Sequence, residues 1–99
     1  MDSKSRLLFW LLAASKGGPT RIKILNILCR EPSNVRRLSL ILSMEYKTIK
    51  THIELMLKYG LIDAIGSKYG RIYYISPEWE KNEFLKKLLR GEKNGVKKN

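Results

Sequence analysis

The stretch from Glu45 to Gly60 constrains the fold of this chain most strongly, because it has the pattern of an amphipathic helix. At about 100° per residue, its apolar residues Ile49, Ile53 and Met56 fall on one stripe. The apolar stripe requires a core built from other segments, and the polar stripe is free to face a partner. The polar stripe consists of Lys47, Lys50, Thr51, Glu54 and Lys58.

The charge of the chain indicates which partners that polar stripe suits. The 99 residues carry a formal net charge of +11, and the pI is about 10.0. The central block 16–76 holds 11 of the 20 Lys and Arg residues against 4 acidic residues, so the excess is not confined to the ends. A positive charge of this size favours polyanions, which are nucleic acids or anionic membrane surfaces.

Length and cysteine content limit the class of protein. A chain of 99 residues is the size of one small domain, with a modest core and no room for a deep catalytic cleft. Its single cysteine, Cys29, lies in an apolar run, where we expect a buried and inert thiol. One cysteine forms no internal disulfide, so we expect an intracellular protein located in the cytoplasm.

The run 7–14 is apolar throughout, which raises the alternatives of a membrane span or an export signal. It is far shorter than the ~20 residues that a helix needs to cross a bilayer. Its length suits the apolar part of a signal peptide, and Lys4 and Arg6 precede it. The basic module that follows argues against export, so we expect a packed helix that other segments enclose on several sides.

Periodicity and turn signals divide the chain into helices and one hairpin. We expect Glu45 to satisfy the first amides of the helix that begins at Tyr46, and Ser76 to cap the last helix through its hydroxyl. The predicted elements are helices 3–15, 19–30, 34–42 and 46–59, strands 61–65 and 71–75 joined by the loop 66–70, and a final helix 77–90.

In two of these elements, the hairpin and the helix 19–30, the order of apolar and polar residues predicts which side chains share a face. In the hairpin, alternation places Ile72 and Tyr74 on one face and Arg71, Tyr73 and Ile75 on the other, and it leaves open which face is buried. In the helix 19–30 we expect Ile22, Leu25, Ile27 and Leu28 to point inward, and Arg21, Lys23 and Arg30 to point outward.

Four groups of residues occur in a specific order and spacing. They are GGPTRIKIL at 17–25, PSN at 32–34 followed by Leu38 and Leu42, YKTI at 46–49 followed by His52, and YG at 69–70 followed by YYIS at 73–76. Together they resemble archaeal winged-helix regulators related to the arsenical-repressor (ArsR) family.

This resemblance implies a mainly α fold with a small β-hairpin, the winged helix-turn-helix. The extra N- and C-terminal helices lie outside the resemblance, and we expect them to serve dimerisation because of their apolar content. The resemblance also implies a transcription regulator that binds double-stranded DNA as a homodimer, with repression the expected mode. The expected division is an N-terminal dimerisation helix at 1–16, a winged helix-turn-helix DNA-binding domain at 17–76, a C-terminal dimerisation helix at 77–90 and a disordered basic tail at 91–99.

The helix 46–59 is expected in the major groove, because that groove accepts one α-helix and exposes base edges to its outward N-terminal residues. We expect base contacts from Tyr46, Lys47, Lys50 and Thr51. The wing 66–71 is expected at the adjacent minor groove or at the backbone. The residues expected at the backbone or in the wing are Thr20, Arg21, Arg36, Arg37, Thr48, His52, Lys68 and Arg71.

Each of these expected contacts has an alternative. For Thr48 and His52 the alternative is packing beside the core, and for the others it is an ordinary solvated surface. We expect the terminal helices to pack together across a two-fold axis, which would give the homodimer. The residues expected in its interface are Leu7, Leu8, Trp10, Leu11, Leu12, Trp79, Leu85, Leu88 and Leu89.

The sequence contains no recognisable motif for catalysis, for phosphate binding in a loop or for metal binding. No catalytic arrangement or phosphate-binding loop is present, and Cys29 and His52 lie in separate helices without metal-ligand spacing. We expect no enzyme, cofactor, metal or membrane partner, and the sequence identifies no small-molecule ligand. Two alternative functions remain open: a winged-helix interaction module of the transcription machinery, and a nucleoid protein that binds DNA without regard to sequence.

Overall fold

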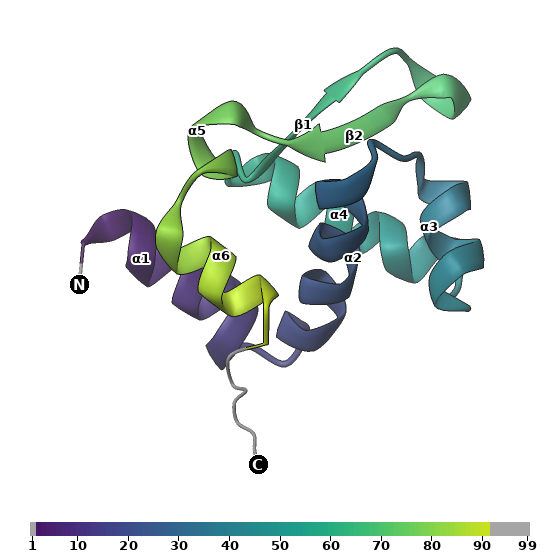
Figure 1. Ribbon diagram of the computed structural model, residues 1–99. Helices are drawn as coiled ribbons and strands as arrows, with labels where there is room; N and C mark the ends of the chain where they lie inside the picture. Colours follow the sequence, from purple (N-terminus) through teal and green to yellow (C-terminus); the bar gives the residue numbers. More distant parts are fainter. Residues whose placement is uncertain (1, 92–99) are drawn as a thin grey trace.

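The computed structural model describes residues 2–91, except for the side chain of Tyr69. Figure 1 shows the helices on one side of a two-stranded hairpin, with the first and last helices next to each other. The basic tail predicted for 91–99 lies, apart from Gly91, outside the described residues. Within the described part of the chain, no helix is both long and apolar enough for a membrane crossing.

The N-terminal helix has two parts, α1 (Ser3–Leu8) and the π-helix η1 (Phe9–Ala14). Asp2 caps α1, because its carboxylate accepts a 2.7 Å hydrogen bond from the backbone amide of Ser5. The amide of Ser15 donates to the carbonyl oxygen of Trp10 at 3.1 Å, which ends η1. The predicted helix 3–15 is therefore present, and its second part is wound more widely than an α-helix.

The next helix, α2 (Gly18–Arg30), passes very close to η1. A Cβ atom at Gly18 would lie 2.3 Å from the carbonyl oxygen of Leu12, so only glycine permits this approach. The prediction for its outer face is wrong at Arg21, which is buried. The predicted buried position of Cys29 is also wrong, because that side chain is exposed at the far end of α2. The inward residues are Ile24, Leu25 and Leu28, while Ile22 and Ile27 are half-buried beside the core.

Two further helices, α3 (Val35–Leu42) and α4 (Tyr46–Lys58), are joined by residues 43–45 and form a helix-turn-helix. Asn34 caps α3 by accepting a 2.8 Å hydrogen bond from the amide of Arg37. Ser43 has a left-handed φ of 54°, which turns the chain into α4.

The ends of α4 differ in how their backbone groups are satisfied. Glu45 occupies the N-cap position without a side-chain hydrogen bond, so the prediction that its carboxylate satisfies the first amides is wrong. At the other end, Gly60 has a φ of 73°, and the amide of Leu61 donates to the carbonyl of Met56 at 2.9 Å. This is the Schellman arrangement, which glycine favours because it needs a left-handed residue.

The hairpin consists of β1 (Ile62–Ile65) and β2 (Ile72–Ile75), with the short 3-10 helix η2 (Lys68–Gly70) in the loop. The strands are antiparallel, with Ile62 opposite Ile75 and Ala64 opposite Tyr73. A third segment joins the edge of β2, because Ser33 and Tyr73 exchange two backbone hydrogen bonds of 3.1 and 2.9 Å. The face that carries Tyr73 and Ile75 is the buried one, because these side chains pack into the core.

The C-terminal segment forms two helices, α5 (Pro77–Glu80) and α6 (Glu83–Leu89), so the single predicted helix 77–90 is wrong. Asn82 interrupts the helix in an extended conformation and accepts a 2.9 Å hydrogen bond from the amide of Leu85. The predicted cap at Ser76 is also wrong, since its buried hydroxyl makes no hydrogen bond with the described residues.

The core draws residues from every long helix and from the hairpin. Five residues predicted in the dimer interface belong to this core and have almost no exposed surface within one chain. They are Leu8, Leu11, Leu12, Trp79 and Leu85. These side chains have no surface left for a partner, so their placement in an interface is corrected to the core of a single chain.

Candidate nucleic-acid interface

The polar stripe of α4 is exposed, as the sequence predicts. Tyr46, Lys47, Lys50 and Thr51 all lie open to solvent near the beginning of the helix. The Thr51 hydroxyl donates to the carbonyl oxygen of Lys47 at 3.0 Å, which leaves its methyl group and its acceptor capacity for a partner. The opposite stripe is fully buried and anchors the helix through Ile49, Ile53 and Met56.

A groove of about 650 Å³ joins the beginnings of α3 and α4 to the tip of the hairpin. Four cations line it, namely Arg36 from α3, Lys50 from α4, Lys68 from the loop and Arg71 at the start of β2. Among the side chains that the structure describes, no acidic one lines this groove. The arrangement therefore suits an extended polyanion rather than a neutral ligand.

Aromatic side chains complete this basic groove. Tyr46 and Tyr73 both line it, and the guanidinium carbon of Arg71 lies 5.7 Å from the centre of the Tyr73 ring. That contact holds the Arg71 side chain by a cation–π interaction. Lys68 adopts a left-handed φ of 48°, which sharply turns the loop that presents its ammonium group.

Arg21 and His52 form a separate polar cluster inside the protein. The exposed fraction of Arg21 is only 5%. Its Nε donates to the carbonyl oxygen of Leu11 at 3.0 Å, one Nη donates to the hydroxyl of Ser15, and the other lies 3.1 Å from Nδ1 of His52. This cluster links η1, α2 and α4, so the prediction that Arg21 faces outward toward a phosphate is replaced by a structural role.

Burial shifts the pKa values of both members of the cluster. The pKa of His52 is lowered by burial and, secondarily, by the positive charge of Arg21. The pKa of Arg21 is lowered by burial as well. A neutral His52 can accept a hydrogen bond from Arg21 at Nδ1, whereas a protonated imidazole has no acceptor to offer.

Comparisons with known proteins agree with this arrangement of elements. A family model described as "Bacterial regulatory protein, arsR family" matches residues 18–64. The solution NMR structure of a homodimeric winged helix-turn-helix DNA-binding domain from Mycobacterium bovis, a possible ArsR-family transcriptional regulator, has a TM-score of 0.69 and 17% sequence identity. The match covers 100% of this chain and 94% of that one. The fold is a winged helix-turn-helix.

A second solved structure with a similar fold is that of a MarR family protein from Bacillus stearothermophilus, with a TM-score of 0.62 and 18% identity. That match covers 92% of this chain and 65% of the Bacillus protein. No curated protein matches the sequence. In the winged helix-turn-helix, α4 is the second helix of the pair, and the hairpin β1–β2 is the wing.

The winged-helix fold brings some predicted residues together and leaves others apart. Lys47 and Thr51 lie on the exposed stripe outside the groove, and Thr20 and Thr48 are half-buried. Arg37 is exposed but turned toward the end of α2, where it donates to Ser33 and lies 3.5 Å from a carboxylate oxygen of Glu31.

Three groove residues were missed by sequence reasoning, namely Asn34, Val35 and Tyr73. Asn34 was predicted as a cap, and its position before the first turn of α3 was the available signal for a place near Arg36. Tyr73 enters the groove because its strand pairs with Ser33, a contact between distant segments that no local pattern reveals. No group of three or more His, Cys, Asp or Glu side chains among residues 2–91 is arranged to hold a metal ion.

Proposed function

We propose that this protein is a transcriptional regulator that binds double-stranded DNA sequence-specifically as a homodimer, with repression the expected mode. The observation that carries the proposal is the basic groove between the helix-turn-helix and the wing, which four cations and no acidic residue line within residues 2–91. The match of residues 18–64 to a family of regulatory proteins supports it. The archaeal source and the lack of enzymatic activity stay predictions.

In this proposal, α4 enters the major groove and the wing 66–71 lies at the adjacent minor groove or backbone. The DNA strand between the two would follow the basic groove, with its phosphates near Arg36, Lys68 and Arg71. Lys47 and Lys50 would donate to guanine edges, and Thr51 would contact a base through its methyl group or as an acceptor. Tyr46 lines the groove beside Lys50 and would be a fourth base contact.

Other predicted backbone residues differ in how well the geometry suits them. Thr20 lies near the beginning of α2, where its amide and hydroxyl would serve a phosphate, and Thr48 lies in the first turn of α4. Arg37 forms an ion pair with Glu31, so we expect it to contribute less to phosphate binding than an unpaired cation would. We assign no direct DNA contact to Arg21, or to His52, which Arg21 engages from inside.

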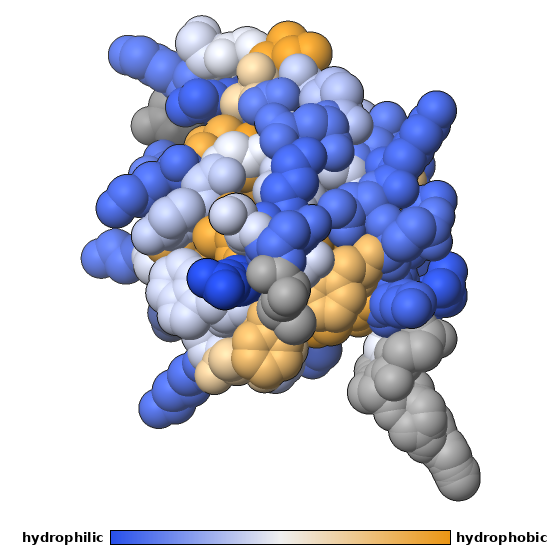
Figure 2. All heavy atoms as spheres, turned by 90° about the vertical axis from the view of Figure 1, so that its left-hand side faces the viewer, coloured by the Kyte–Doolittle hydropathy of each residue, from blue (hydrophilic) through white to orange (hydrophobic). Residues whose placement is uncertain are grey.

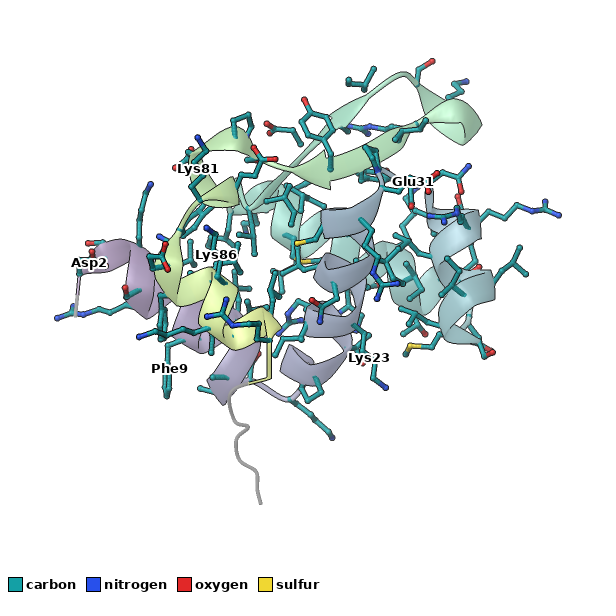
Figure 3. The ribbon with its side chains drawn as sticks, in the orientation of Figure 1. Asp2, Phe9, Lys23, Glu31, Lys81 and Lys86 are labelled. Carbon is teal, nitrogen blue, oxygen red and sulfur yellow. The ribbon has the colours of Figure 1, made fainter. Side chains whose placement is uncertain are left out.

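The homodimer is proposed through the N-terminal helix and α6. Phe9 and Trp10 remain 47% and 46% exposed, and Phe9 points outward from the helix (Figure 3). Figure 2 shows apolar side chains gathered on this face, with hydrophilic side chains around them. The homodimeric state named for the Mycobacterium domain supports the proposal. Half-buried Leu7, Phe84, Leu88 and Leu89 would extend the interface.

A binding titration tests the DNA proposal. Selection of bound sequences from random DNA supplies a duplex, which is then compared with a scrambled duplex of the same composition. We expect tighter binding to the selected duplex, with two half-sites about 34 Å apart along the helix axis. The absence of binding to either duplex at low salt would support the interaction module, and equal affinity for both would support the nucleoid protein.

Light scattering tests the dimer, since a monomer has a mass of 11.5 kDa. We expect twice that mass for the wild type and a shift toward the monomer for Trp10→Glu, which places a charge on the proposed interface. Tyr46→Glu is a matched control, because it adds the same charge to an exposed aromatic in the basic groove. A wild-type monomer at high concentration would contradict the proposed interface.

A further inference from the structure

A second hollow lies on a different part of the molecule from the basic groove. It is enclosed by the end of α2, by β2 and by α6, and its volume is about 650 Å³. Leu28 and Ile75 form part of its wall, and Leu85 and Leu89 contribute from α6. The volume falls within the range of about 300–1,000 Å³ that is typical of small-molecule sites.

Large aliphatic side chains of the wing remain exposed at this hollow. Ile65 and Ile72 face each other across the two strands, and their exposed fractions are 65% and 41%. Both line the hollow, together with Tyr74. An apolar ligand would remove part of this surface from water, at about 25 cal/mol per Å² of apolar area buried.

The charged groups at this hollow indicate the charge of the ligand. Arg30 and Lys86 line it, and within residues 2–91 Glu80 is the only acidic residue that does so. The side chain of Arg30 forms no ion pair or hydrogen bond within residues 2–91. The ammonium group of Lys86 forms a long ion pair of 3.8 Å with the carboxylate of Glu83, which is exposed to solvent. In Figure 3, Lys86 lies on the side of α6 that faces the hairpin. The two cations and Glu80 together give the lining a net charge of +1, which complements a ligand with one negative charge.

We propose that this hollow binds an amphipathic monoanion, a carboxylate with an apolar body of about 20 non-hydrogen atoms. The size follows from the volume, since a water molecule occupies about 30 Å³ in the liquid. The apolar body lies against Ile72 and the aliphatic wall, and the carboxylate meets Arg30 and Lys86. A dianion fits less well, because its second negative charge would lie near the carboxylate of Glu80 rather than near another cation.

The rate at which Cys29 is alkylated can be used to detect a ligand in this hollow. It is the only cysteine of the chain, it lines the hollow, and its side chain is exposed. Neighbouring groups partly desolvate the thiol, which raises its pKa, and Glu80 raises it further. The thiol therefore reacts slowly at neutral pH, and its alkylation is best followed at mildly alkaline pH.

The experiment uses 1-pyrenebutyrate as the carboxylate and 1-pyrenebutanol as its uncharged match. Fluorescence titration gives the affinity, and mass spectrometry gives the rate at which iodoacetamide alkylates Cys29. We expect saturable binding of the carboxylate, several-fold slower alkylation at saturation, and weaker binding of the alcohol. Neither readout involves DNA, so their failure would leave the proposed DNA-binding function standing.

Substitutions locate the site. We expect Arg30→Gln and Lys86→Gln each to weaken the carboxylate about two- to five-fold and to leave the alcohol unchanged, as for partly exposed charge pairs. Ile72→Ser should weaken both probes. Lys23→Gln removes the same charge from an exposed position on α2 outside the hollow and should change neither. Unprotected Cys29, or equal losses in Arg30→Gln and Lys23→Gln, would overturn the proposal in favour of non-specific attraction to a basic protein.

Discussion

The Arg21 guanidinium is enclosed by hydrogen-bond acceptors rather than by a carboxylate. Leu11 and Ser15 supply oxygen atoms from η1 and its end, and His52 supplies Nδ1 from α4. Gly17 completes the enclosure, since a Cβ there would lie 2.6 Å from an Nη of Arg21 and 2.8 Å from the His52 ring. A buried cation without a counter-charge depends on such hydrogen bonds.

Replacement of Arg21 tests this cluster. We expect Arg21→Met to lower the free energy of unfolding by about 1–3 kcal/mol, because Nδ1 of His52 then loses its partner. Lys23→Met on the exposed side of α2 is the control and should change it by less than about 0.5 kcal/mol. Urea denaturation measures both, and an Arg21→Met protein as stable as the wild type would contradict the structural role.

The pH dependence of stability tests the protonation state of His52. Its pKa in the folded protein is lowered from 6.5, first by burial and then by Arg21, so the unfolded chain binds a proton more readily than the folded protein. The contribution of this group to stability is therefore complete above about pH 6.5 and declines as the pH falls toward its folded pKa.

His52→Gln keeps a possible acceptor for Arg21 and removes the only histidine of the chain. Between about pH 7 and pH 5, we expect the wild type to lose more stability than this variant, as measured by urea denaturation at each pH. The carboxylates common to both proteins cancel in the comparison. Parallel pH profiles would show that the folded protein does not hold His52 neutral.

At the scale of elements, the contact between η1 and α2 depends on one position without a side chain. We expect Gly18→Ala to lower the free energy of unfolding by about 1–3 kcal/mol, because the new methyl group would meet the backbone oxygen of Leu12. Gly70→Ala is the control, since a Cβ there meets nothing within 4 Å. Thermal unfolding should separate the variants, and equal melting temperatures would contradict the close approach.

The types of the elements could be predicted from local patterns, and their tertiary details could not. The stripes of α4 follow from periodicity, and the break between η1 and α2 follows from glycine and proline. The inward turn of Arg21 depends instead on acceptors in η1 and α4. The buried face of the hairpin depends on its packing against α2 and the rest of the core, which comes from distant parts of the chain. A local signal for the break before α6 did exist, namely the capping residue Asn82.

At the scale of the whole molecule, the candidate site is formed by residues from separate segments of the chain. Arg36, Lys50, Lys68 and Arg71 were each predicted as candidates for DNA contact from their own surroundings. Their place along one groove depends on the wing lying beside the beginning of α3, which no single segment encodes. The central claim is that this groove holds DNA phosphates.

The salt dependence of DNA binding tests that claim most directly. With about six to eight phosphates neutralised per dimer, log affinity should fall with log salt at a slope of roughly −5 to −7. Lys68→Gln removes one groove cation per protomer, so we expect its slope to be less steep by about 2. Lys81→Gln, on α5's side of the molecule away from the groove (Figure 3), should keep the wild-type slope. A weak wild-type slope, or equal slopes in both variants, would contradict the account.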